Sequence, residues 1–339
     1  MSKIEIKCVN KSFDNIVALK DVSFISEENE FITILGSSGC GKTTLLRIIA
    51  GLEKESSGKV FVDGKDITCR EPMDRDISMV FQTTTLYPQK NVYENIAFPL
   101  KLQKKNKNEI LEEVESLAKK MEIYDLLNRK PNTLSGGQRQ RVCIAKALIK
   151  KPKIYLFDEP LSSLDENLKN KMKEELKRLH KNTGAVFIYV THDQNEALYL
   201  GDRIIVMNKG KIEQIGTVNE IYNKPSNLFV ANFIGNPKIN IISSEDYNTI
   251  NNDNKLSNNG IIAVRPENIK FEKGKTTNAI ITYKENYGKN IIYKVIVSDN
   301  EITIEANRDI SEYKVGDKVL IKIKNYHIFD KTTQKRIEE

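Results

Sequence analysis

The stretch Gly36-Ser-Ser-Gly-Cys-Gly-Lys42-Thr43 constrains the fold of this 339-residue chain more than any other feature. It fits the pattern G-x-x-x-x-G-K-[ST], with a strand-like run at residues 31–35 before it and a helical run at residues 44–50 after it. Glycines let successive backbone N–H groups curl around a phosphate, and a helix N-terminus adds the positive end of its dipole. The sequence therefore predicts a nucleotide-binding loop made of Gly36, Ser37, Ser38, Gly39, Cys40, Gly41, Lys42, Thr43 and Thr44.

An acidic pair, Asp158 and Glu159, supplies the carboxylates that the loop itself does not contain. The apolar run at residues 154–157 is typical of a central parallel strand, and it ends in Asp158-Glu159. Ligands of open α/β sheets lie beyond the carboxyl ends of the strands, so both carboxylates should face the loop. We expect Lys42 to reach the β- and γ-phosphates of ATP, Thr43 and Asp158 to hold Mg²⁺, and Glu159 to activate water as general base. Asp158 and Glu159 could instead form a solvated turn after a core strand. The presence of the phosphate loop in the same chain disfavours this simpler interpretation.

A second helix start has the features of an anion site. In Leu134-Ser-Gly-Gly-Gln138, Ser135 and Gln138 form the pattern of a capping box. A well-capped helix would explain that pair, but Gly136 and Gly137 each cost a helix about 1 kcal/mol relative to Ala. Bare backbone at a helix N-terminus suits a phosphate. One chain is therefore expected to carry two phosphate-facing helix starts.

The order of the remaining segments predicts an α/β domain followed by a small all-β one. Strand-like runs alternate with helical ones up to about residue 235, with a hairpin signal at residues 59–65 and a helical subdomain at about residues 88–150. Residues 236–259 are rich in Asn, Ser and Asp, which favours a linker or long loop. Short alternating strands in residues 260–339 favour a small β-barrel.

Charge, hydropathy and cysteine spacing argue against nucleic-acid binding, a membrane span, a secretory signal and a disulfide or metal framework. The net charge of +7 comes from 53 Lys and Arg dispersed among 46 Asp and Glu, so we expect no nucleic-acid partner. No apolar run reaches the length of a membrane span, and residues 1–13 lack the apolar stretch of a secretory signal. The spacing of the four cysteines fits neither a metal site nor a disulfide framework. Because Cys40 lies inside the loop, bulky thiol reagents are expected to inhibit, and ATP to protect.

Taken together, the loop, the acidic pair and Leu134–Gln138 resemble an ABC-type ATPase. In that family two copies face head to tail, and each ATP lies between the phosphate loop of one and the Ser-Gly-Gly segment of the other, which here is Ser135, Gly136 and Gly137 with Gln138. The resemblance also implies that Phe13 stacks on adenine, and that Gln82 contacts Mg²⁺ or the attacking water. It implies that Asp165, in Leu161-Ser-Ser-Leu-Asp165, belongs to a loop that links the two active sites across the dimer. It also implies that His192 contacts the γ-phosphate.

Finer resemblances point to an importer. Residues 86–100 resemble the coupling region of importers for sugars and related solutes, and residues 201–225 and 233–237 are similar to ATPase subunits of the maltose and glycerol-3-phosphate type. Residues 263–269 and 327–330 resemble that family's C-terminal oligonucleotide-binding-fold domain. The resemblance implies two membrane permease subunits, an external solute-binding protein and a peripheral position on the cytoplasmic face of the membrane. Ser37 stands where this subgroup usually has proline.

Three alternatives remain open on the sequence. ATPases of polyamine, iron, phosphonate and anion importers are closely similar. A soluble ABC ATPase of DNA repair or ribosomes is disfavoured, because the chain has no long coiled-coil insertion and no second phosphate loop. A generic phosphate-loop kinase leaves residues 134–138 and 161–165 unexplained.

Overall fold

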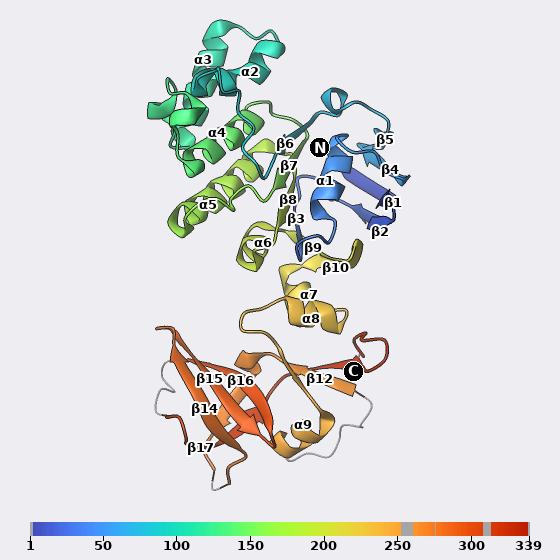
Figure 1. Cartoon of the computed structure of the whole chain (residues 1–339), viewed down its shortest axis with the longest axis vertical. Coiled ribbons are helices and arrows are strands. Elements are labelled where there is room, and N and C mark those ends of the chain that lie inside the picture. The colour runs from blue at the N-terminus through green and yellow to red at the C-terminus, as the bar shows by residue number, and fades with distance from the viewer. Residues whose placement is uncertain (1–2, 252–259, 275, 308–312, 338–339) are drawn as a thin grey trace. The chain divides into compact units, whose positions relative to one another are not determined.

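The computed structural model describes residues 3–251, 260–274, 276–307 and 313–337. The chain forms two compact units, Met1–Val218 and Asn219–Glu339, and Figure 1 labels most of their elements. They divide after Val218, earlier than the predicted domain boundary at residue 235. Among the residues described, none of the helices has both the length and the apolar character needed to cross a bilayer.

A six-stranded sheet organises the first unit. Its order is β10-β9-β3-β8-β7-β6, and all pairings are parallel except that of the edge strand β10 with β9. The bounds are β3 Phe31–Gly36, β6 Ile77–Val80, β7 Ile154–Asp158, β8 Val186–Thr191, β9 Arg203–Asn208 and β10 Lys211–Thr217. The predicted α/β class is confirmed.

The two faces of this sheet bury different side chains. In β7, Ile154 and Leu156 point to one face, where helix α1 (Lys42–Ala50) packs, whereas Tyr155 and Phe157 point to the other. The second face carries an aromatic cluster in which Tyr155 and Phe187 have ring centroids 4.7 Å apart. Both faces are covered, so the central strands β3, β7 and β8 are mostly apolar, and the charged groups of β7 lie at its end.

On the α1 side lies a four-stranded antiparallel sheet with the order β2-β1-β4-β5 (Figure 1). Its strands are β1 Ile4–Phe13, β2 Ile16–Ile25, β4 Ser57–Val62 and β5 Lys65–Asp66. The predicted hairpin at residues 59–65 is confirmed, because β4 pairs with β5 across the turn at Asp63 and Gly64. Helix α1 is thus packed between two sheets, which fixes the helix that follows the phosphate loop.

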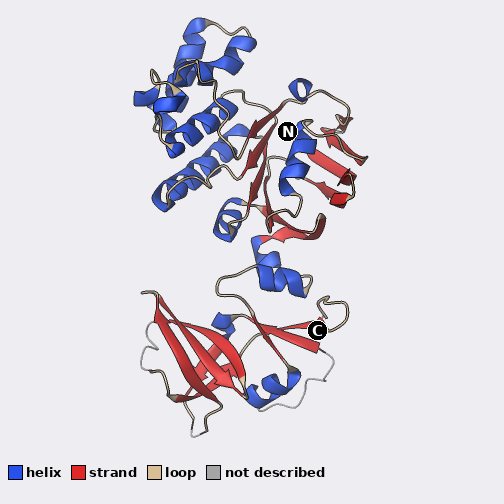
Figure 2. Cartoon of the chain, in the orientation of Figure 1, coloured by secondary structure: helices blue, strands red, loops and turns tan. Residues whose placement is uncertain are grey.

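Helices cover the face that carries the aromatic cluster. Figure 2 shows these helices gathered on one side of the six-stranded sheet. They are α2 Val92–Leu102, α3 Lys107–Lys120, α4 Gly136–Leu148, α5 Glu166–Thr183 and α6 Gln194–Leu200, with short 3-10 turns η2 Tyr124–Leu126 and η3 Pro131–Thr133. A further 3-10 turn, η1 Pro72–Asp74, precedes Arg75 near the end of α1. Helix α2 buries Val92, Ile96 and Leu100 at helical spacing and begins with a capping box between Asn91 and Glu94. The helices α2 to α4 lie within the predicted helical subdomain.

The second unit is built mainly from antiparallel strands. One sheet has the order β11-β12-β18 and the other β13-β17-β14-β15-β16. Its elements are α7 Val218–Asn223, α8 Leu228–Phe233, β11 Asn240–Ile242, α9 Ser244–Asn251, β12 Gly260–Val264, η4 Pro266–Asn268, β13 Ile269–Glu272, β14 Ala279–Asn286, β15 Asn290–Val297, β16 Asn300–Asn307, β17 Lys318–Ile323 and β18 His327–Asp330. The antiparallel C-terminal domain expected from the alternating pattern is confirmed.

The prediction of a linker at residues 236–259 is wrong for residues 240–251, which form β11 and α9. Asn240 shows why the Asn-rich composition was misleading. Its side-chain amide bonds the backbone of Thr303 and so holds the segment in place. Its Nδ2 donates to the Thr303 carbonyl at 2.8 Å, and its Oδ1 accepts from the Thr303 N–H at 2.8 Å. Tyr247 and Ile250 of α9 are buried in the core of the unit. Residues 252–259 lie outside the described residues.

Candidate functional site

The phosphate loop connects the end of β3 at Gly36 to the start of α1 at Lys42. Gly41 has φ 102°, and a Cβ there would lie 2.5 Å from the Ala18 carbonyl oxygen of β2, so only glycine fits. Gly41 is also the N-cap of α1, no side chain caps the helix, and its first turn contains no acidic residue. The first N–H groups of α1 therefore remain available to an anion.

Lys42 lies within this loop rather than in solvent. It is only 5% exposed, and its Nζ donates to the carbonyl oxygens of Gly36 at 2.8 Å and Ser37 at 3.0 Å. The loop thus holds the ammonium group close to the N–H groups at the start of α1. This combination concentrates positive charge where the phosphates of a nucleotide are expected.

Asp158 and Thr43 meet beside the loop. The Thr43 hydroxyl donates to Asp158 Oδ1 at 2.9 Å, although the two residues are 115 positions apart. Asp158 ends β7 and is 3% exposed. Burial raises the pKa of the Asp158 carboxyl, the hydrogen bond from Thr43 opposes this rise, and the charge of Glu159 adds to it. A cation bound here would favour the ionised form.

Glu159 is held by backbone and side-chain contacts. Its φ of 46° is unusual for a residue other than glycine, and its N–H donates to the Val190 carbonyl at 3.0 Å. Its Oε2 lies 2.9 Å from His192 Nδ1 and accepts from Gln82 Nε2 at 3.3 Å. Gln82 and His192, both expected at the site from the family resemblance, therefore converge on one carboxylate oxygen of Glu159.

Lys42, Thr43, Gln82, Glu159 and His192 line one cavity of about 570 Å³, a size typical of ligand sites. Its lining comprises Ile16, Val17, Ala18, Ser38, Gly39, Gly41, Lys42, Thr43, Thr44, Gln82, Glu159 and His192. The sequence interpretation missed Ile16, Val17 and Ala18 of β2. Ile16 and Val17 are 72% and 57% exposed, and the signal that marks them is a pair of apolar side chains directly after the turn at Asp14 and Asn15.

Four residues predicted to contact the nucleotide from the phosphate loop and the adenine side lie outside this lining: Phe13, Gly36, Ser37 and Cys40. Phe13 ends β1, is 43% exposed and has the Lys11 ammonium 4.6 Å from its ring centroid. Cys40 is 3% exposed, and its thiol packs in the core beneath the loop. Burial raises the pKa of Cys40. The expectation that bulky thiol reagents react at Cys40 is therefore revised, because the thiol is buried and its protonated form is favoured.

The start of α4 forms the expected capping box but does not reach the cavity of its own chain. Gln138 N–H donates to Ser135 Oγ at 3.2 Å, and Ser135 N–H donates to Gln138 Oε1 at 2.9 Å. Asp165 caps α5 by accepting from the Leu168 N–H at 3.0 Å. None of the residues Ser135, Gly136, Gly137, Gln138 and Asp165 lines the cavity. One copy of the chain therefore brings together only part of the predicted site.

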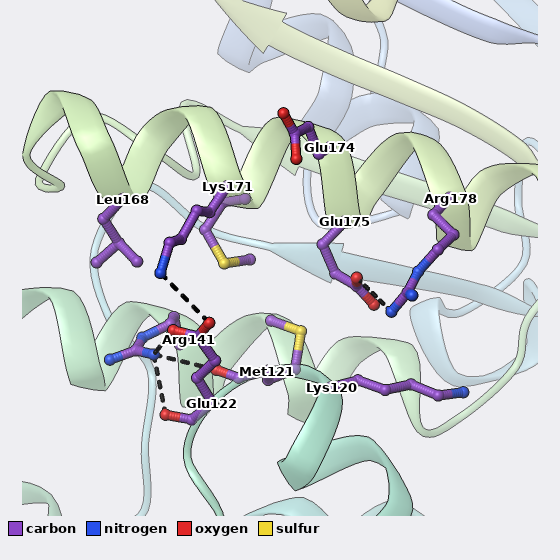
Figure 3. Close-up of a pocket in the computed structure, with 10 residues that line it drawn as sticks. Lys120, Met121, Glu122, Arg141, Leu168, Lys171, Glu174, Glu175 and Arg178 are labelled. Carbon is purple, nitrogen blue, oxygen red and sulfur yellow. Dashed lines mark hydrogen bonds and ion pairs between the residues drawn. The ribbon is translucent and has the colours of Figure 1, made fainter.

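A second cavity of about 320 Å³ lies between α5, the end of α3 and α4 (Figure 3). Its charged groups largely neutralise one another: Glu175 pairs with Arg178 at 2.6 Å, and Lys171 lies 3.5 Å from Glu122. Arg141 donates to the Glu122 carbonyl at 2.9 Å. No residue predicted for the nucleotide lines this cavity, so its ion pairs are best explained by the packing of the three helices.

Comparison with known proteins places this geometry in a family. The family description for the ABC transporter matches residues 19–162. The trehalose/maltose import ATP-binding protein of Thermococcus litoralis is 39% identical, with 99% of this chain and 100% of that protein covered. The sn-glycerol-3-phosphate import ATP-binding protein of Bartonella bacilliformis is 41% identical, with the same two shares. A solved dimeric ATP-binding cassette in a post-hydrolysis state with ADP and phosphate is similar with a TM-score of 0.59 and 35% identity, covering 63% of this chain and 98% of that one.

Proposed function

The chain belongs to the ATP-binding subunits of ABC transporters and is an importer ATPase, and from this premise we propose that it drives uptake of a sugar or glycerol-phosphate solute. In this proposal it works as a pair of identical copies attached to two membrane permease subunits at the cytoplasmic face. An external solute-binding protein delivers the cargo. The names of the two relatives support the solute class, and their coverage of nearly the whole chain supports the same arrangement of subunits.

The observation that carries the proposal is the convergence of Gln82 and His192 on Glu159 in the cavity that Lys42 and Thr43 also line. Lys42 and the N–H groups at the start of α1 would bind the β- and γ-phosphates. Glu159 would take the proton of the attacking water as general base. His192 and Gln82 orient the Glu159 carboxylate through the contacts at 2.9 and 3.3 Å. Ile16 and Val17 offer an apolar surface to the base of the nucleotide.

The residues present also fit a magnesium ion. Mg²⁺ in nucleotide sites is typically bound by one or two carboxylates or hydroxyls together with phosphate oxygens and water. Asp158 and Thr43, which lie 2.9 Å apart, supply one carboxylate and one hydroxyl beside the loop. The described residues contain no cluster of three or more His, Cys, Asp or Glu that would form a separate cage. When bound, the ion would neutralise charge on the phosphates. Asp158, Thr43 and Gln82 are the residues that we propose would hold it.

A second copy would supply what the cavity of one chain lacks. The capping box of α4 satisfies the Gln138 N–H but leaves the N–H groups of Gly136 and Gly137 without intrahelical partners. A Cβ added at Gly136 would have no neighbour within 4 Å. We propose that this surface faces the γ-phosphate bound by the other copy, so that hydrolysis requires a dimer.

The test mixes two inactive variants. Lys42→Ala removes the ammonium group of the phosphate loop. Gly136→Asp places a carboxylate where a phosphate is expected, while an acidic residue in the first turn of α4 should leave the fold intact or stabilise it. In a mixed dimer, one site contains both lesions and the other contains neither. We expect the mixture to hydrolyse ATP faster than the sum of the two variants measured separately. A mixture no faster than that sum, combined with turnover independent of protein concentration, would reject the shared site.

The solute class has its own test. Cells lacking this chain should lose uptake of a labelled disaccharide or of labelled glycerol 3-phosphate, and should regain it with the wild-type chain but not with Lys42→Ala. Co-purification from membranes identifies the permease and the binding protein. Normal uptake of both solutes in the deletion strain would contradict the proposed class while leaving the ATPase assignment intact.

A further inference from the structure

We propose that Arg75 is a positioning residue for ATP hydrolysis, acting at the end of α1 opposite the phosphate loop. This inference rests on the proposed nucleotide site. Arg75 follows the 3-10 turn η1 and is only 5% exposed. It touches none of the residues to which the preceding paragraphs give a chemical role, so its effect would be exerted through α1 and β6.

The guanidinium of Arg75 joins two segments of backbone, the end of α1 and residues 68–70. Its Nη1 donates to the carbonyl oxygens of Ile48 at 2.8 Å and Ile49 at 3.0 Å, which belong to the last turn of α1. Its Nε donates to the Arg70 carbonyl at 2.9 Å, and its Nη2 donates to the Thr68 carbonyl at 2.6 Å. Only a planar group with several N–H donors can make these contacts together, so lysine cannot replace arginine here.

The electrostatics explain why a buried cation is tolerated at this position. Among the described residues, no carboxylate lies within ion-pair distance of Arg75, and its four hydrogen-bond acceptors are neutral carbonyls. Two of them lie at the negative end of the α1 dipole, which favours a positive charge. Arg75 therefore stabilises one end of α1 by the same field that favours a phosphate at its other end.

Gly51 makes room for this contact. It is the C-cap of α1 with φ 76°, and its N–H donates to the Ile48 carbonyl, which also accepts from Arg75. A Cβ at residue 51 would lie 2.5 Å from Arg75 Nε and 2.7 Å from Cζ. A side chain at this position would have to push the guanidinium away from the helix end.

Arg75 thereby couples two parts of the cavity. Helix α1 has nine residues and is about 14 Å long, with Lys42 and Thr43 at the end opposite Arg75. Along the chain, Arg75 is two residues before β6, which leads directly to Gln82. Lys42, Thr43 and Gln82 all line the cavity. A displacement of about 1 Å between reacting groups can lower a rate on the order of a hundredfold. A small shift of α1 or β6 after loss of the Arg75 contacts should therefore slow ATP hydrolysis.

The experiment uses the full chain with Mg-ATP and compares three variants. Arg75→Lys removes the fork of donors, and Gly51→Ala displaces the guanidinium from the other side. Gly64→Ala is the matched control, because Gly64 has a similar φ of 74° but a Cβ there would have no neighbour within 4 Å. We expect the first two to raise the Kd for ATP and to lower kcat/KM by about tenfold, a loss consistent with a shift smaller than 1 Å. Gly64→Ala should lower Tm by a few degrees and leave both constants unchanged.

The readouts separate positioning from stability. If Arg75→Lys and Gly51→Ala lower Tm but bind and hydrolyse ATP like Gly64→Ala in the folded state, the inference is overturned. Failure of both variants to fold would also overturn it, because Arg75 would then be a requirement for folding. Lys42→Ala is measured in parallel. Unchanged ATP affinity in that variant would reject the nucleotide site itself rather than the role of Arg75.

Discussion

Replacing Glu159 with glutamine tests the chemistry of the site with little change in its shape. The two side chains have the same size, and the backbone contacts of residue 159, to the Val190 carbonyl at 3.0 Å and from Ser162 Oγ at 3.0 Å, do not depend on the carboxylate. The left-handed backbone at 159 is no harder for glutamine than for glutamate. We therefore expect the free energy of unfolding to change by no more than about 0.5 kcal/mol.

The effect on turnover should be far larger. An amide cannot accept the proton of water, and a positioned general base contributes roughly a hundredfold to ten-thousandfold in rate. The barrier to hydrolysis should accordingly rise by about 2.7–5.5 kcal/mol. ATP affinity should stay equal or increase, because one negative charge beside the γ-phosphate is removed while Lys42 and the phosphate loop are unchanged. ATP-bound dimers should accumulate as a result.

Three measurements decide the matter: phosphate release at saturating Mg-ATP, nucleotide Kd, and mass by light scattering with and without ATP. Glu272→Gln is the matched control, since Glu272 pairs with Lys324 at 2.6 Å in the second unit and lines no part of the cavity. That variant should hydrolyse ATP normally. A Glu159→Gln protein with wild-type kcat would refute the assignment of Glu159 as base.

Three further predictions concern single side chains. Thr43→Val removes the hydrogen bond that the Thr43 hydroxyl donates to the buried Asp158 carboxylate and should lower the free energy of unfolding, measured in urea, by about 1–3 kcal/mol. Asn240→Ala leaves the Thr303 N–H and carbonyl without their partner, and hydrogen exchange at Thr303 should speed up while ATP turnover by the first unit is retained. Burial, together with Arg336 and Arg265, lowers the pKa of His327 from 6.5 to about 4, so the unfolded chain binds more protons between these values. Stability should therefore be fully present above pH 6.5 and fall as the pH drops towards 4, and His327→Asn should remove this dependence.

The parts of the fold that could be predicted are those where local pattern and tertiary environment agree. Strands β3, β7 and β8 are buried on both faces, so each is a largely apolar run, and each ends at or directly before a residue of the site. The loop and the acidic pair follow from those strand ends. The close approach of Gln82, Glu159 and His192 was expected only through family resemblance, because three separate segments have to meet and no spacing in the sequence encodes that contact.

The strands that escaped prediction have interrupted patterns. In β1, Ile4, Ile6 and Val9 are buried, but the alternation slips at Cys8, whose φ is 47° and which lies at a shift in register with β2. A bulge of this kind moves later side chains to the opposite face, so a period of two is lost within ten residues. Packing of β1 against the rest of the unit outweighs this local signal.

The two glycines of α4 show how far an argument from residue type extends. Both were attributed to an anion site because a helix start gains nothing from glycine. For Gly137 the packing offers a second reason, since a Cβ there would lie 3.1 Å from Leu164 Cδ2. Gly136 has no such neighbour among the described residues, and alanine would fit the space around it. Within one chain Gly136 is therefore unexplained, and a phosphate presented by a second copy supplies the missing reason. If Gly136→Ala proved as active as the wild type at every protein concentration, that reason would disappear and only the packing of Gly137 would remain.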